Sequence, residues 1–157
     1  MRTLIIYESV HHGNTERVAR AMADALGARM VKPADISPGE LAQYDLIGFG
    51  SGIYFGRHHR RLRRFVKRLP SMSKSAFVFS SCGANRNQNR GLVGLLARKG
   101  FSIRGDFFCP GFDTMGPLFF IGGLKRGHPD ARDLEAAREF AGRLVHQAEA
   151  AVRPKVA

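Results

Sequence analysis

Residues 4–15 read Leu-Ile-Ile-Tyr-Glu-Ser-Val-His-His-Gly-Asn-Thr, a short apolar run followed by a polar loop with one glycine. After this loop, apolar residues recur at helical spacing up to Gly27; they are Val18, Ala19, Met22, Ala23 and Leu26. The apolar run is typical of a buried strand, and the later spacing is typical of a helix with one buried face. The segment therefore predicts a strand, a loop and a helix in that order.

The rest of the chain repeats this alternation. Further strands are expected at 29–32, 46–50, 76–80 and 101–109, the last of them interrupted at Gly105. Further helices are expected near 62–69, 92–96 and 130–150, with a short helix beginning at Ser37 and Pro38. Short apolar strands that alternate with helices favour a parallel sheet with helices on both faces. We predict one α/β domain over residues 1–157, with a basic tail after about residue 150.

Cysteine usage and hydropathy bear on the compartment. The two cysteines, Cys82 and Cys109, are far apart and lack CxxC spacing, which favours a reducing compartment and gives no thiolate metal site. No apolar run has the length of a signal peptide or a membrane span. We therefore expect a cytoplasmic protein without a metal centre.

The charge is concentrated in the middle of the chain. The net charge is +12, and residues 46–105 contain 13 Arg and Lys residues and no acidic residue. Within this block, the segment Arg57 to Arg68 is a candidate docking surface for acidic protein partners, a nicotinamide phosphate or a membrane surface. Nucleic acid is not expected, because the segment has no base-reading motif. The alternative is a simple solvated helix face, although like charges four residues apart repel.

The loop after the first strand has the chemistry of a phosphate site. It contains Ser9, Val10, His11, His12, Gly13, Asn14 and Thr15. Gly13 lets the main chain approach an anion, and Ser9, His11 and Thr15 offer side-chain donors beside the free N–H groups of the helix start. The alternative is an ordinary helix N-cap with a permissive glycine.

The loop after the third strand combines glycines with aromatic residues. It contains Gly50, Ser51, Gly52, Ile53, Tyr54, Phe55 and Gly56. Glycines let peptide groups lie close to a flat heterocycle, and Tyr54 or Phe55 can stack on its face. The alternative is a tight turn whose aromatic residues pack in the core.

The loop after the fourth strand is small and polar. It contains Ser81, Cys82, Gly83, Ala84 and Asn85. Its main-chain groups can bind the edge of a ring. Because no local motif ties a base to Cys82, we interpret this cysteine as a small buried residue and not as a nucleophile.

In their order along the chain, these three loops resemble the flavodoxin family. The Gly-Asn-Thr ending of the first loop looks like that family's phosphate loop, and the other two loops look like its flavin-ring loops. Segments Gly111 to Thr114 and Gly127 to Pro129 also resemble short flavodoxin-like proteins. The resemblance implies a three-layer α/β/α sandwich with a five-stranded parallel sheet of order 2-1-3-4-5, FMN bound by the three loops, and electron transfer.

The chain differs from typical flavodoxins in two respects, and alternative functions stay open. His11 and His12 stand where many flavodoxins have Thr or Ser with Gly, and the middle of the chain is basic where electron carriers are usually acidic. Our leading hypothesis is an FMN electron carrier in which the flavin supplies the chemistry and no side chain is catalytic. The alternatives are an FMN-dependent NAD(P)H:quinone-type reductase and a flavin-free interaction module. The segment Phe107 to Gly116, with Asp113, either touches the ring or packs beside it.

Overall fold

The computed structural model describes residues 1–10, 12–83, 86–111 and 127–152, with the backbone alone for 149–152. In chain order, the elements are β1 (Thr3–Glu8), α1 (Asn14–Leu26), β2 (Arg29–Val31), the 3-10 helix η1 (Pro38–Gln43), β3 (Leu46–Tyr54), β4 (Arg57–His58), α2 (Arg60–Arg68), β5 (Ser75–Cys82), α3 (Arg90–Arg98), β6 (Ser102–Pro110) and α4 (Ala131–Val152). Within these ranges, no helix has the length and apolar character that a membrane span requires.

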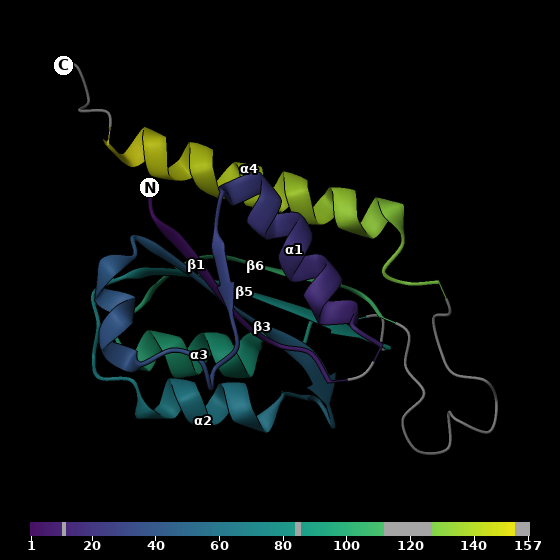
Figure 1. The fold of residues 1–157 in the computed structure, drawn as a ribbon, viewed down its shortest axis with the longest axis horizontal. Coiled ribbons are helices and arrows are strands. Elements are labelled where there is room, and N and C mark those ends of the chain that lie inside the picture. The colour runs from purple at the N-terminus through teal and green to yellow at the C-terminus, as the bar shows by residue number, and fades with distance from the viewer. Residues whose placement is uncertain (11, 84–85, 112–126, 153–157) are drawn as a thin grey trace.

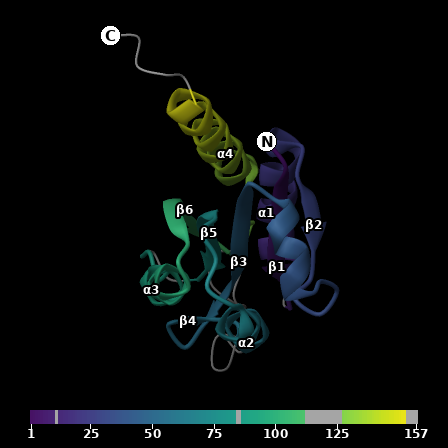
Figure 2. The same ribbon diagram turned by 90° about the vertical axis from the view of Figure 1, so that its left-hand side faces the viewer.

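The main sheet is parallel and has the order β2-β1-β3-β5-β6, with the short β4 added antiparallel to β3. If β4 is left aside, this is the predicted 2-1-3-4-5 order. Helices α1 and α4 cover one face of the sheet, and α2 and α3 cover the other, so three layers are visible (Figure 1; Figure 2). The fold prediction is therefore confirmed, and β4 is the strand that the pattern missed, because two residues are too short to show a period.

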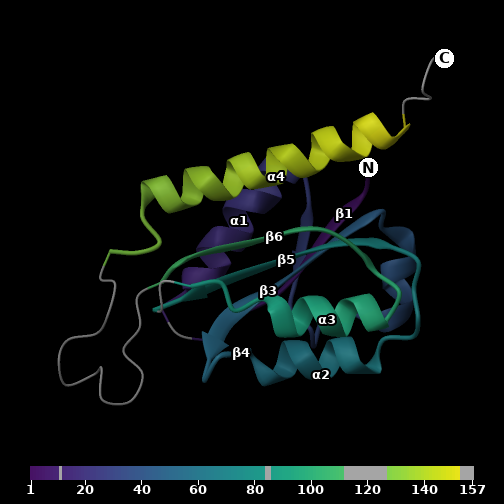
Figure 3. The same ribbon diagram turned by 180° about the vertical axis from the view of Figure 1, so that it is seen from behind.

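The core consists of two apolar layers, one on each face of the sheet. Figure 3 shows the helices that cover these two faces. In β1, Leu4 and Ile6 face the layer that contains α2 and α3, whereas Ile5 and Tyr7 face α1 and α4. This alternation follows from the two-residue period of a strand. A strand that is buried on both faces needs apolar residues at every position, and this need explains the continuous apolar run of 4–7.

Two glycines of β3 make room for aromatic rings of the neighbouring strand. A Cβ atom on Gly48 would lie 2.3 Å from the ring of Phe77, and a Cβ atom on Gly50 would lie 2.1 Å from the ring of Phe79. Real atoms do not approach this closely, so only glycine fits at either position. Gly50, which we considered as a close-approach residue of a loop, serves core packing instead.

The last strand of the sheet, β6, is irregular where the sequence predicts an interruption. Ala76 pairs with Ile103 and Phe77 pairs with Gly105, so one residue of β6 has no counterpart on β5. This extra residue is a β-bulge, which bends a strand without ending it. The predicted interruption at Gly105 is thus a bulge within a continuous strand.

Candidate functional site

The carboxyl ends of β1, β3 and β5 lie side by side. Glu8 of β1 pairs with Ser51 of β3, and Ser51 in turn pairs with Ser80 of β5. The chain segments that follow these strands therefore leave the sheet at one common edge, where α1 also begins (Figure 1). In parallel sheets this edge is the usual place for a ligand.

The first loop reaches α1 through a left-handed backbone. Gly13 has φ 65° and caps the helix, and His12 before it has φ 54°. Thr15 is buried, and its hydroxyl lies 2.8 Å from the hydroxyl of Ser81 at the end of β5. Asn14 and Thr15, which were predicted as loop residues, therefore lie in the first turn of α1, and a buried hydrogen bond joins this turn to the end of β5.

Ser9, at the start of the same loop, has a hydroxyl oxygen that is buried and lacks a hydrogen-bond partner in the part of the chain that the structure describes. A buried polar atom of this kind costs free energy unless a ligand satisfies it. Val10, in contrast, is exposed, and His11 lies outside the described residues. The loop therefore presents one unsatisfied donor next to a helix start, as an anion site requires.

A carboxylate also lies at this edge. Glu8 ends β1, and its side chain is 8% exposed. The guanidinium of Arg61, from the first turn of α2, lies 3.8 Å from the Glu8 carboxylate. Arg61 therefore offsets the negative charge of Glu8, which would otherwise oppose an anion nearby.

The predicted second loop is largely a β-hairpin. Residues Ser51 to Tyr54 continue β3, and Ile53 and Tyr54 pair with β4. Phe55 (φ 50°) and Gly56 (φ 76°) form the two-residue turn, and positive φ at both positions is typical of type I′. The loop prediction from 51 to 54 is wrong, because the glycines suggested a loop in a segment where strand pairing holds the chain.

The two aromatic residues of the hairpin differ in their surroundings. Tyr54 folds back over Gly52, where a Cβ atom would lie 3.1 Å from the tyrosine Oη. Its ring also contacts the ring of His59 edge to face, with a centroid distance of 5.3 Å. The side chain of Phe55 is 92% exposed at the tip of the turn. Phe55 is therefore the aromatic side chain with its ring open to a ligand or a partner.

His58 holds the hairpin to the rest of the sheet. Its Nδ1 lies 2.9 Å from the Ser51 hydroxyl, and its Nε2 lies 3.0 Å from the Asn89 Oδ1. The Asn89 amide nitrogen donates to Asp106 (3.0 Å) and to the carbonyl of Phe107 (2.9 Å), so its Oδ1 must accept from His58. The neutral His58 ring then accepts at Nδ1 from the Ser51 hydroxyl, whose single proton is shared with the Gly52 carbonyl oxygen at 2.8 Å. These hydrogen bonds link β3, β4, the N-cap of α3 and β6.

This arrangement corrects one part of the docking prediction. His58 is 4% exposed, so it is not part of the surface of the basic segment. The pKa of His58 is lowered to about 4. Burial is the main cause, the hydrogen bond to Asn89 acts in the opposite direction, and the charge of Arg63 adds to the lowering. His58 is therefore uncharged at neutral pH. In the sequence, nothing distinguishes His58 from the other residues of the basic run. The signal that could have indicated a polar partner for it is Asn89, which stands at the N-cap position before α3.

The third predicted loop begins inside β5. Ser81 and Cys82 end the strand, Gly83 follows, and Ala84 and Asn85 lie outside the described residues. Cys82 is buried and does not form a disulfide, and its carbonyl accepts a hydrogen bond from the Gly111 amide (2.9 Å). Of the segment 111–114, the structure describes Gly111 alone; Asp113 is outside it.

Gly111 fits between the first and third loops. A Cβ atom at this position would lie 3.1 Å from the Asn14 side-chain nitrogen and 3.2 Å from the Ser81 Cβ. Cys109, two residues earlier, is also a buried free thiol. Burial first, and then nearby Asp133, raise the pKa of Cys109 to about 12, so it is not a nucleophile at neutral pH.

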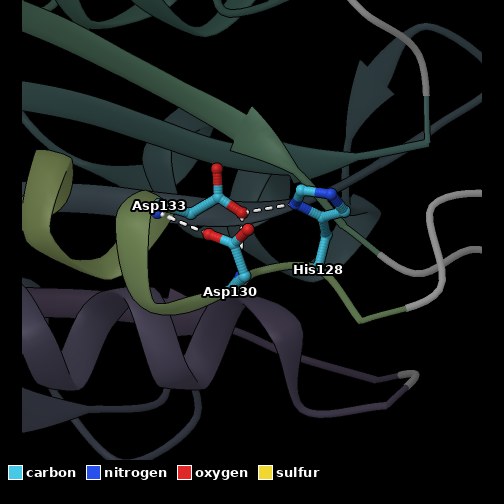
Figure 4. A group of neighbouring side chains, drawn as sticks. All are labelled: His128, Asp130 and Asp133. Atoms are coloured by element: carbon cyan, nitrogen blue, oxygen red, sulfur yellow. Dashed lines mark hydrogen bonds and ion pairs between the residues drawn. The ribbon is translucent and has the colours of Figure 1, made fainter.

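His128, Asp130 and Asp133 gather where α4 begins (Figure 4). His128 Nδ1 donates to the Asp133 carboxylate at 2.6 Å, and the Asp130 amide donates to the same oxygen at 2.8 Å. The Asp130 carboxylate accepts from the amides of Arg132 and Asp133. These oxygens already serve a reciprocal helix cap, so the group is explained by helix capping.

The comparisons with known proteins give the family. Residues 4–101 match the flavodoxin domain family. The chain belongs to the flavodoxin family. A flavodoxin from the domain Archaea has a similar structure, with a TM-score of 0.73 and 14% identity over 95% of this chain and 99% of that chain. Oxidised flavodoxin 1 from Bacillus cereus has a TM-score of 0.71 and 19% identity over 93% of this chain and 98% of that chain.

A closer sequence relative comes from an archaeon. The chain is 42% identical over 144 residues to uncharacterized protein MJ0298 of Methanocaldococcus jannaschii, which covers 90% of this chain and 96% of that protein. The structural matches, at their low identities, confirm the predicted flavodoxin fold and no more. The family match confirms the resemblance that the three loops indicated.

Proposed function

We propose that this flavodoxin-family chain binds one FMN at the carboxyl ends of β1, β3 and β5 and transfers electrons between redox partners. The observation that carries the proposal is the buried hydroxyl of Ser9, which has no hydrogen-bond partner among the described residues and lies in the loop leading to α1. A phosphate oxygen is a suitable acceptor for it. When bound, FMN supplies the redox chemistry, and the protein supplies orientation and electrostatics.

We assign the phosphate to the first loop. Ser9, Thr15 and the amides around Gly13 are its donors, together with His11, His12 and Asn14. The left-handed backbone of Gly13 turns the chain into α1 so that its first N–H groups, which have no acceptor within the helix, face the loop. The hydrogen bond between Thr15 and Ser81 holds this loop against the third loop, whose main chain from Ser81 to Asn85 we assign to the ring edge.

The hairpin supplies the ring contacts. We assign the ring face to Phe55 or Tyr54 and the adjoining backbone to Gly52, Ile53 and Gly56. Ser51 is fully buried and its hydroxyl is engaged by His58 and by the amide of His59 (2.9 Å), so it positions the hairpin and does not touch the cofactor. No side chain of this set needs to transfer a proton for single-electron exchange.

We further propose that acidic redox partners dock on α2. An open depression beside this helix is lined by Pro33 and Ala34 together with Arg61, Arg64, Lys67 and Arg68. Charge of one sign on such a surface steers an oppositely charged partner and accelerates its encounter. Cys82 and Cys109 are buried and form no disulfide, which supports a cytoplasmic location, where thiols stay reduced.

The decisive experiment compares FMN with riboflavin, which lacks the phosphate. We expect a yellow protein that releases FMN on acid treatment and binds riboflavin far more weakly. Ser9→Ala should weaken FMN binding by roughly 1.5 to 3 kcal/mol, the worth of a hydrogen bond to a charged group. Thr3→Val is the matched control, because the Thr3 hydroxyl is also buried without a partner among the described residues but lies at the opposite end of β1.

Equal affinity for FMN and riboflavin, or equal effects of the two substitutions, would contradict the phosphate assignment. Steady-state oxidation of NAD(P)H by the isolated protein would instead identify the quinone-type reductase. A colourless protein that binds neither flavin would support the third alternative, a flavin-free interaction module.

A further inference from the structure

A second pocket lies between α2 and α3, beside the hairpin turn. Its volume is about 270 Å³, and its walls include Gly56 of the turn, Gln88, and the apolar side chains of Leu92 and Leu95. Four cations also line it: Arg57, Arg63, Lys67 and Arg98. These residues come from β4, α2 and α3, so cations that are up to 41 positions apart in the sequence (57 to 98) surround one cavity. We propose that this pocket binds the phosphate groups of a small phosphorylated compound.

The charge of the pocket is uncompensated in the described part of the chain. None of its lining residues is acidic, and none of its four cations forms an ion pair with a described residue. Some arginines elsewhere do form ion pairs, as Arg20 does with Glu16 and Arg138 does with Glu135. Arg63 and Lys67 are four residues apart on α2, where like charges repel. A bound anion would relieve this repulsion.

The chemistry of the lining favours phosphate. Arginine presents a planar fork that binds phosphate oxygens in pairs, and lysine adds a point charge. His58 closes the inner wall, but both of its ring nitrogens are engaged by Ser51 and Asn89, so it offers no donor to the ligand. The cations and the Gln88 amide therefore supply the recognition, and the leucines can contact an apolar part of the ligand.

The size of the pocket favours a small compound over a protein. Pockets for small ligands have volumes of roughly 300 to 1,000 Å³, so a cavity of about 270 Å³ has room for one or two phosphate groups and part of the group to which they are attached. The open depression next to Arg64 and Arg68, on the other hand, is the better surface for a protein. The inference does not depend on FMN, because none of the pocket cations belongs to the three loops assigned to the cofactor.

Calorimetric titration of the purified protein at constant ionic strength tests the proposal. The probes are inorganic pyrophosphate and ADP, and FMN is added to saturation beforehand. We expect the double variant Arg63→Gln/Arg98→Gln to bind pyrophosphate more weakly, by about tenfold or more for each guanidinium. The matched control is Arg64→Gln/Arg68→Gln, which removes the same charge from the same face but outside the pocket. This control should bind pyrophosphate nearly as the wild type does.

The outcomes separate the possible sources of the phosphate. Tighter binding of ADP than of pyrophosphate would support a nucleotide as the ligand, and equal binding would support a free polyphosphate. Equal losses of pyrophosphate affinity in the two double variants would show that only the overall charge matters, and would overturn the proposal of a binding pocket. Binding of an acidic peptide, with no binding of pyrophosphate, would assign the cavity to a protein partner and also overturn the proposal. Ser9→Ala should leave pyrophosphate binding unchanged, so a failure of the FMN site is recognised separately.

Discussion

The two halves of β3 perform different tasks. From Leu46 to Gly50 the strand lies between the two apolar layers, and Gly48 and Gly50 accept the rings of Phe77 and Phe79. From Ser51 to Tyr54 the same strand carries polar hydrogen bonds and enters the hairpin. The change occurs opposite Glu8, where β1 ends. One continuous strand therefore supplies the core in its first half and holds the candidate site in its second.

A substitution in the first half should have the largest effect. Gly50→Ala places a methyl group 2.1 Å from the Phe79 ring, in a core that cannot relax easily. We expect the free energy of unfolding to fall by about 3 kcal/mol, at the upper end of overpacking costs. Gly52→Ala in the second half meets Tyr54, a side chain near the surface, and should cost less stability. Urea denaturation of both variants checks this, and equal losses would show that the halves do not differ.

The hydrogen bonds of the second half should depend on pH. The pKa of His58 is lowered to about 4 in the folded protein, whereas an unfolded chain keeps the usual 6.5. The unfolded state therefore binds more protons between these values, and stability is complete above pH 6.5 and falls as the pH drops toward 4. The expected loss is at most about 3 kcal/mol. The free energy of unfolding, measured by denaturation at several pH values in this range, should depend less on pH in His58→Gln than in the wild type. An equal dependence on pH in the two proteins would show that His58 is not buried in its uncharged form.

A substitution in the hairpin turn should have opposite effects on the stability of the fold and on FMN binding. Phe55 has φ 50°, a conformation that strains a bulky residue, and its side chain is exposed. Phe55→Gly should therefore raise the free energy of unfolding by up to about 1 kcal/mol. If Phe55 stacks on the flavin, the same change weakens FMN binding by about 1 kcal/mol. Tyr54→Ala is the comparison: a loss of affinity confined to that variant would transfer the stacking role to Tyr54.

The smallest effect is expected on α2, outside the strand. Arg64→Glu/Arg68→Glu should slow electron exchange with an acidic redox protein, since each exposed charge contributes a fraction of a kcal/mol to about 1 kcal/mol. The difference from wild type should shrink at high salt. Stopped-flow rates at several ionic strengths measure it, with Arg138→Glu on α4 as the control. Rates that do not depend on salt would mean that partners dock elsewhere.

The comparison within β3 also shows how far the sequence predicts the structure. The apolar runs and their helical neighbours were sufficient to predict a parallel sheet with helices on both faces, because burial on both faces leaves a continuous signal such as that of 4–7. The strand order came from the resemblance to the flavodoxin family. The glycines of 48–56 are ambiguous by contrast: Gly50 serves packing, Gly52 accommodates Tyr54, and Gly56 forms a turn. Composition alone does not separate these uses, because each depends on a partner that is distant in the sequence or on local backbone geometry.

The candidate site was predictable in its position and less so in its details. Loops after parallel strands meet at one edge whatever their sequence, so the first and third loops were identified from the order of elements. The chain of hydrogen bonds through His58 and Asn89 could not be predicted, because these two residues are 31 positions apart and His58 lies within a run of cations. Long-range polar contacts of this kind have no period and no local motif.

The hydrogen bond between Thr15 and Ser81 has a kinetic consequence. It joins the first turn of α1 to the end of β5, 66 residues apart, so the entropy of bringing these two segments together is lost when the chain folds. If FMN binds at the proposed site, its capture should then be a single collision step whose observed rate rises linearly with FMN concentration. In Thr15→Val the two segments should be less firmly ordered before binding, and the observed rate should level off at high FMN concentration.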